Sequence, residues 1–183
     1  MGIQIGARPD SGFDDPIGML KDCHRRIEQF LRILCVVVEQ AHGRALSAEE
    51  AEAVRSALRY FRSGGQRHTA DEEESLFPRM RREPSTADAL REIEALEADH
   101  REANDLHVAV EKLYAGWADG RTLSAEDEVQ LRSATERLKR LYEGHIKIEE
   151  SVVFPRAAEA LDRGAIAAMG IEFRERRRGE GRD

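Results

Sequence analysis

His145-Ile-Lys-Ile-Glu-Glu-Ser-Val-Val-Phe-Pro155 is the stretch that decides the fold, because the chain contains a second version of it. The earlier copy is His68-Thr-Ala-Asp-Glu-Glu-Glu-Ser-Leu-Phe-Pro78, 77 residues upstream, and both copies follow His-x-x-x-Glu-Glu and end in Phe-Pro in the same register. On a helix, residues four apart lie on one face, so each copy directs an imidazole and a carboxylate the same way. The chain is therefore a tandem of two related halves.

The repeat extends well beyond these two motifs. Leu46-Ser-Ala-Glu recurs as Leu123-Ser-Ala-Glu at the same offset of 77, and His24 matches His100 at an offset of 76. Each half thus carries one lone histidine and one His-x-x-x-Glu motif. We expect the fold to bring these groups together.

Composition excludes several classes of protein. The chain has 183 residues, of which 36% are charged and 5% aromatic, a balance that favours amphipathic helices. The net charge of −7 argues against nucleic-acid binding, which needs a basic surface. No apolar run reaches the ~18 residues of a membrane-spanning helix. Cys23 and Cys35 would lie roughly 18 Å apart on one helix, too far to pair, so we expect reduced thiols and a cytoplasmic protein.

Capping signals predict where the helices begin and end. Asp15-Pro16 predicts the start of a first helix that ends near His42-Gly43, and Ser47-Ala-Glu-Glu50 is a capping box that opens a second. Pro78 should kink or loosen the end of that helix. A third helix is predicted from Ser85 to Gly120, and Ser124-Ala-Glu-Asp127 opens a fourth.

The order of these elements predicts the fold class. Four long helices with short connections favour an all-α protein, an antiparallel up-down-up-down four-helix bundle with internal two-fold duplication and a short C-terminal helix. We expect a flexible N-terminal arm over residues 1–13, the bundle over residues 14–162, and a short helix with an Arg-rich tail over residues 163–183. The short helix should end near Phe173, and Arg176-Arg177-Arg178 is expected to be solvated.

Six polar groups occupy positions that the helical pattern reserves for Leu or Ile: His24, His68, Glu72, His100, His145 and Glu149. Burying an unpaired carboxylate costs several kcal/mol, so such groups normally become neutral, pair or bind a metal. A pair of cations would satisfy all six at once. Imidazole together with carboxylate suits iron, with manganese or zinc as substitutes.

The same residues resemble the hemerythrin-like (HHE cation-binding) domain over about residues 14–162. The resemblance rests on the two lone histidines, the two His-x-x-x-Glu motifs and the Phe-Pro that follows each motif. It implies two iron ions joined by an oxo or hydroxo bridge. Glu72 and Glu149 would bridge the ions, with His24 and His68 on one and His100 and His145 on the other. No residue is assigned a catalytic role beyond metal binding.

The chain departs from the oxygen-carrying hemerythrins at Asn104, where they have a further histidine. Fewer protein donors leave open positions on the ions, which favours reaction with O2, peroxide or nitric oxide over reversible oxygen carriage. Glu28, the first-half counterpart of Asn104, is a candidate extra ligand, with a surface charge as the alternative. Tyr142 is expected to line the pocket and donate a hydrogen bond, or simply to pack. His107, two turns from His100, is expected to be a core histidine with a local partner.

Two other functions stay open from the sequence. One is an iron-storage or iron-donating protein related to those that repair iron–sulfur clusters, and the other is a structural bundle with a zinc site. The expected partner in the leading hypothesis is a small molecule, with no nucleic acid and no membrane. The sequence does not identify a protein partner.

Overall fold

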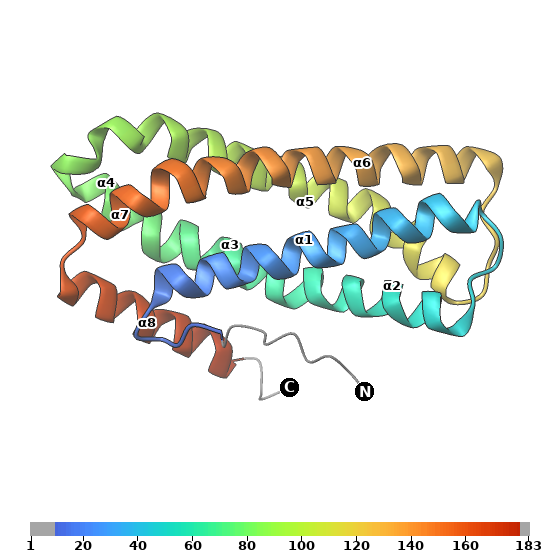
Figure 1. Cartoon of the computed structure of the whole chain (residues 1–183), viewed down its shortest axis with the longest axis horizontal. Helices are drawn as coiled ribbons and strands as arrows, with labels where there is room; N and C mark the ends of the chain where they lie inside the picture. Colours follow the sequence, from blue (N-terminus) through green and yellow to red (C-terminus); the bar gives the residue numbers. More distant parts are fainter. Residues whose placement is uncertain (1–9, 180–183) are drawn as a thin grey trace, which may run out of the picture.

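Four long helical rods run antiparallel along the molecule, and a further helix lies alongside them near one end (Figure 1). The computed structural model describes residues 10–179. The first rod is α1 (Pro16–Ala41), and the third is α5 (Leu90–Ala118). The second rod joins α2 (Ala48–Tyr60), a π-helical turn (Phe61–Gly65), α3 (Gln66–Asp71), a π-helical turn (Glu72–Leu76) and α4 (Phe77–Arg82). The fourth joins α6 (Ala125–Ile148), a π-helical turn (Glu149–Val153) and α7 (Phe154–Ala160), and α8 (Arg163–Gly179) follows.

The predicted bundle is confirmed. Helix α1 packs against α2 and α6, and α5 packs against the same two helices, so the four rods form a closed square. Within residues 10–179, none of the helices combines the length and the apolar character needed to cross a membrane. Cys23 and Cys35 are both buried and free, as their spacing predicted.

Three helix starts follow the predicted capping chemistry. Asp15, Ser47 and Ser124 each accept, through the side chain, a hydrogen bond from the backbone N–H three residues further on. At Ser47 the capping box is complete, because the Glu50 carboxylate also accepts from the Ser47 N–H. Each cap satisfies donors that would otherwise lack a partner in the first helical turn.

The third rod begins differently from the prediction, which placed its start at Ser85. Residues Pro84–Ala89 form a 3-10 turn, and α5 begins only at Leu90. The residue before a proline is pushed away from helical geometry, and Glu83 is extended with ψ 111°. Thr86 then donates its hydroxyl to the Glu83 carbonyl at 2.8 Å, which tightens this corner.

Two π-helical turns recur at the same place in the two halves, Glu72–Leu76 and Glu149–Val153. Each ends directly before a Phe-Pro pair, where the missing proline N–H interrupts the regular hydrogen-bond ladder. The loosening that Pro78 predicted is therefore present, and Pro155 repeats it. Both turns begin with the glutamate of a His-x-x-x-Glu motif.

The core consists of two apolar clusters. One surrounds Ile27, Ala103 and Leu138 toward the α1–α2 and α5–α6 connections, and the other surrounds Leu20, Leu96 and other residues near α8. The predicted polar positions fall between them along each rod. The bundle therefore contains a polar layer between two apolar segments of its core.

Helix α8 corrects two expectations about the C-terminal segment. It continues past Phe173 to Gly179, and Arg176 and Arg177 are not a solvated tail. Both arginines pair with the fully buried Asp71 of α3, with N–O distances of 2.8 Å. A buried carboxylate needs such partners, which explains why the arginine run is ordered against the bundle.

The expected N-terminal arm falls mostly on residues 1–9, which lie outside the described residues, as do residues 180–183 of the tail. Its described part is held to the fold: the Ser11 N–H donates to Asp22, and Arg174 of α8 lies 4.9 Å above the Phe13 ring. Gly170 permits this contact, because a Cβ there would sit 1.8 Å from the Phe13 carbonyl oxygen.

Candidate metal centre

The six polar groups singled out in the sequence come together at mid-bundle. Their side chains are between 0% and 8% exposed: His24 on α1, His68 on α3, Glu72 and Glu149 on the π-helical turns, His100 on α5 and His145 on α6. The structure arranges them as two groups of four that share both glutamates. In each group, one ligand atom per residue lies within 4.8 Å of all the others.

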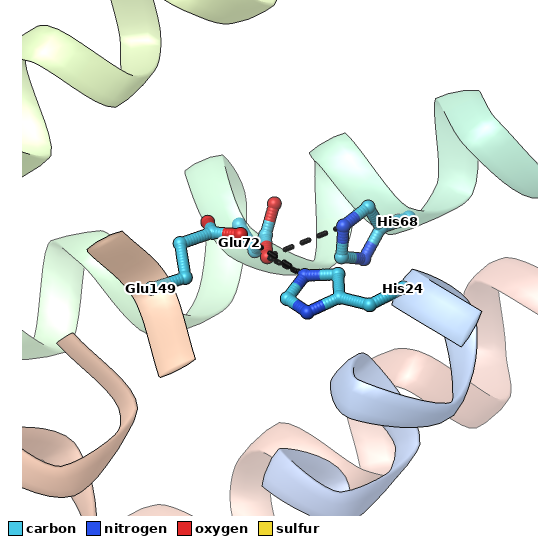
Figure 2. A group of neighbouring side chains, drawn as sticks. All are labelled: His24, His68, Glu72 and Glu149. Carbon is cyan, nitrogen blue, oxygen red and sulfur yellow. Dashed lines mark ion pairs between the residues drawn. The ribbon is translucent and has the colours of Figure 1, made fainter. Parts of the chain in front are cut away.

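The first group contains His24, His68, Glu72 and Glu149, which converge from three of the four rods (Figure 2). The His24 Nε2 atom lies 3.0 Å from Glu149 Oε2 and 4.0 Å from Glu72 Oε1. His68 Nε2 lies 3.5 Å from the same Glu72 Oε1. Both imidazoles therefore present Nε2 to Glu72, and His24 presents it to Glu149 as well.

The second group contains His100 and His145 with the same two glutamates. His100 Nε2 lies 3.4 Å from Glu72 Oε2, and His145 Nε2 lies 3.2 Å from Glu149 Oε2. Glu72 thus turns one oxygen toward the histidines of the first half and its other oxygen toward His100. This is the geometry of a carboxylate that bridges two cations.

The donor atoms of this layer lack hydrogen-bond partners among the described residues. Both carboxylate oxygens of Glu72 and of Glu149 are buried without a hydrogen bond, as is the Nε2 atom of His24, His100 and His145. Orphaned polar atoms of this kind are costly and rare in native interiors. A shared pair of cations would satisfy the four oxygens and the three nitrogens together, so the residues fit a binuclear metal site.

The two carboxylates differ electrostatically. Burial and the nearby negative charge of Glu149 raise the pKa of Glu72 well above its ordinary value. Burial also opposes ionisation of Glu149, but the adjacent His145 and His24 hold its pKa well below the ordinary value. Without metal, the layer thus favours the protonated form of Glu72 and the ionised form of Glu149. A carboxylate that binds a cation is ionised, so cation binding would oppose the protonation of Glu72 that burial favours.

The far side of two histidines is held by carboxylates that the sequence reasoning missed. The Nδ1 atoms of His24 and His100 lie 2.8 Å from Glu150 Oε1 and Glu73 Oε1. Such a partner fixes the tautomer and points Nε2 toward a metal. The signal was present, because Glu73 and Glu150 are the second glutamate of Glu-Glu in each copy of the motif.

The remaining two histidines break this symmetry. His145 Nδ1 lies 3.5 Å from Asp99 Oδ2, whereas the Nδ1 atom of His68 is buried without a hydrogen-bond partner among the described residues. The position that matches Asp99 in the first half, at the offset of 76, is Cys23. A cysteine cannot replace the carboxylate, so the two ends of the site are not equivalent.

The phenylalanines of the two Phe-Pro pairs stack on the lone histidines. Phe154 lies 5.3 Å from the His24 ring with an interplanar angle of 12°, and Phe77 lies 6.3 Å from the His100 ring with an angle of 13°. Each half therefore positions the lone histidine of the other half, through its second glutamate and its phenylalanine.

The additional candidates lie around the site rather than in it. Glu28 is exposed and belongs to neither group of four, which favours the alternative of a surface charge. Asn104 is also exposed, at the edge of a cavity beside His100. Tyr142 lines the same cavity, and its ring centroid lies 6.4 Å from that of His145.

His107 has the local partner that the sequence predicted. Its Nε2 atom lies 3.1 Å from the Tyr142 hydroxyl, and its ring lies 4.5 Å from Phe61. Burial lowers the pKa of His107 to about 4, and burial raises the pKa of Tyr142. The pair is therefore uncharged at neutral pH.

Comparison with known proteins agrees with this geometry. A family model described as the hemerythrin HHE cation binding domain matches residues 15–169. A protein of Haemophilus influenzae whose name is "Uncharacterized protein" is 27% identical over 167 residues, which cover 90% of this chain and 91% of that protein.

Proposed function

Because the chain belongs to the hemerythrin HHE cation-binding domain family, we propose that it is a non-haem di-iron protein that reacts with O2, peroxide or nitric oxide. The single observation that carries this proposal is the set of buried donor atoms without hydrogen-bond partners. In this proposal His24 and His68 bind one ion, His100 and His145 bind the other, and both glutamates bridge. Sensing, scavenging and detoxification all fit such chemistry.

The donor set supports iron. Imidazole nitrogens with carboxylate oxygens suit iron, and each group of four offers two of each. Four protein donors leave open positions on an ion that accepts six. A bound iron pair would supply electrons to an oxidising small molecule at those positions.

The protein's own residues control how that chemistry proceeds. Glu73 and Glu150 hold His100 and His24 in the orientation that presents Nε2. The apolar clusters on both sides of the layer keep its donor atoms buried, which strengthens electrostatic interactions within it. The raised pKa of Glu72 opposes the ionised form that binds a cation, so metal affinity should depend on pH.

The test is metal analysis combined with absorption spectroscopy. We expect two iron ions per chain after anaerobic loading, and a new absorption band on exposure to O2, hydrogen peroxide or nitric oxide. Glu28→Ala serves as a surface control and should retain both ions. No spectral change with any of the three molecules would overturn the proposal.

A structural zinc site is the second candidate. Two imidazoles and two carboxylates complete the four-coordinate sphere that zinc prefers, and each group of four provides them. Metal content after expression with iron in excess separates the two candidates, because a zinc bundle would still carry zinc. The deep burial of all six donors gives no support to iron donation, since release would require the layer to open.

A further inference from the structure

A cavity of about 530 Å³ lies beside His100, between the second rod and α5. His100 and Glu73 line it, so its inner end reaches the second group of metal donors. A molecule of the size of water or hydrogen peroxide needs only roughly 30 Å³, whereas pockets for organic ligands measure roughly 300 to 1,000 Å³. The cavity is therefore much larger than a small inorganic substrate requires.

The internal repeat explains why the cavity is on this side. Gly65 lines it, and the matching residue of the second half is Tyr142. Ala103 also lines it, and its counterpart at the offset of 76 is Ile27, a buried core residue. The space thus exists between the second rod and α5, where both of these residues are small, whereas their repeat counterparts on α6 and α1 are large. Duplication alone would have produced two similar sides.

The charges around the cavity do not favour a charged ligand. Arg62 is paired with Glu111 at 2.7 Å, and Glu73 is paired with His100 at 2.8 Å. The lining contains one further arginine and one further acid, Arg101 and Asp105, so acids slightly outnumber bases. No positive excess is present to attract a carboxylate or a phosphate.

The walls offer apolar surface together with neutral hydrogen-bonding groups. Leu58, Phe61 and Val108 contribute apolar side chains, and Val108 is 68% exposed. The His107–Tyr142 pair forms part of the lining, and both members are uncharged at neutral pH because burial shifts their pKa values away from it. An apolar molecule with one small polar group matches these walls.

We propose that this cavity binds an uncharged organic hydroperoxide with an apolar body about the size of a phenyl group, its peroxide group directed at His100. The inference rests on the proposed function and names a substrate class for it. In the reaction the O–O bond breaks, two ferrous ions each lose one electron, and two protons are taken up. The products are the corresponding alcohol and water.

The first experiment measures binding without metal. The probe is 2-phenylpropan-2-ol, the alcohol formed from cumene hydroperoxide, titrated into the metal-free protein and followed by NMR. Ala103→Ile introduces the larger residue found at the matching position of the other half and should weaken binding about tenfold, because its side chain fills part of the pocket. Ala109→Ile, on the exposed face of the same helix, should not weaken it.

A second variant guards against a folding defect. Gly65 has helical geometry with φ −64°, and a Cβ there meets its nearest atom, Phe61 Cδ1, at an ordinary 3.6 Å. Gly65→Leu should therefore fold and fill the same space. Circular dichroism and metal stoichiometry check both variants. If the alcohol binds to both variants as tightly as to the unmodified protein, the inference is overturned.

The second experiment uses the iron-loaded protein and compares two peroxides. Ala103→Ile and Gly65→Leu should slow oxidation of the iron by cumene hydroperoxide about tenfold, and leave oxidation by hydrogen peroxide within about twofold. If both peroxides oxidise the iron at the same rate in the variants as in the unmodified protein, the hydroperoxide site is overturned. Failure of the unmodified protein to react with O2, nitric oxide or either peroxide overturns the proposed function instead, and the alcohol titration still reports on the cavity.

Discussion

Glu73 and Glu150 act on the metal layer without pointing into it. Each is partly exposed and lies 2.8 Å from the Nδ1 atom of a lone histidine, so each keeps that ring in the tautomer whose Nε2 is free to bind a cation. The π-helical turn places the first glutamate of each pair inside the bundle and leaves the second at its edge. One Glu-Glu pair therefore supplies a bridging candidate and an orienting partner.

Removing either orienting carboxylate should weaken metal binding. We expect Glu73→Ala or Glu150→Ala to lower the affinity for Fe²⁺ by about 10- to 100-fold, because the histidine ring loses its fixed orientation. Glutamine at either position should recover part of the loss, since its amide oxygen still accepts from Nδ1. Competition with a chelator measures the affinity, and Glu94→Ala, exposed on α5, is the control. Wild-type affinity in both alanine variants would contradict the orienting role.

His107 should make stability depend on pH. Its pKa falls from 6.5 to about 4 on folding because of burial, so between these values the unfolded chain binds a proton that the folded chain does not. The free energy of unfolding should fall as the pH drops from 6.5 to 4, by about 2 kcal/mol for a half-buried ring, and the effect should level off below pH 4. NMR titration of the His107 ring gives its pKa, and His107→Asn should flatten this part of the stability profile. A ring that titrates near 6.5 would exclude this explanation.

At the scale of elements, α8 is tied to the rod that carries His68 and Glu72. Asp71 is fully buried directly before Glu72, and its two oxygens are bound by Arg176 and Arg177. Arg79 of α4 binds Glu172 of α8 at 2.7 Å in the same interface. The last helix therefore packs against the segment from which two candidate metal donors project.

Breaking this contact should destabilise the whole protein. The double variant Arg176→Ala with Arg177→Ala leaves Asp71 buried and unpaired, and we expect a loss of about 3 kcal/mol in the free energy of unfolding. Arg178→Ala, exposed on the same helix, should change it by less than about 0.5 kcal/mol. Urea unfolding of the metal-free proteins provides the comparison. Equal stabilities of the double variant and the control would mean that α8 does not brace the rod.

Features that recur in both halves could be predicted from the sequence, whereas features present in only one half mostly could not. Each of the three candidate donors in one half has a counterpart in the other, and the Ser47 cap has its counterpart in Ser124. Because each pattern occurs twice, it could be distinguished from a chance occurrence. Asp71 corresponds to Ile148, so nothing in the repeat indicated the arginine contact. Gly65 corresponds to Tyr142, which indicates that the two sides of the site differ but not that a cavity is present. The arginine contact and the cavity both depend on packing between distant segments, which local periodicity does not encode.

At the scale of the whole molecule, the two halves are interleaved rather than placed side by side. Each half supplies the two histidines of one group, while both glutamates belong to both groups. Glu73 of the first half supports His100 of the second, and Glu150 of the second supports His24 of the first. Neither half therefore completes a site alone, which gives a physical reason for both motifs to remain in one chain.

This arrangement predicts how metal stoichiometry responds to single changes. His68→Ala and its repeat counterpart His145→Ala should each remove one ion per chain, because each deletes a donor from one group of four. Glu72→Ala should weaken both ions, since its oxygens face His68 at 3.5 Å and His100 at 3.4 Å. Elemental analysis after anaerobic loading and desalting counts the ions, and His42→Ala, on an exposed residue after α1, is the control.

The comparison between the two histidine variants carries the most information. Equal retention of one ion by His68→Ala and His145→Ala would mean that each group of four binds independently once the carboxylates are in place. Loss of both ions from either variant would mean that the bridging glutamates need two cations to stay ionised, which the raised pKa of Glu72 makes a physical alternative. Retention of two ions by His68→Ala would mean that His68 is not a metal donor. Its ring, whose Nδ1 atom has no hydrogen-bond partner among the described residues, would then contribute only to packing.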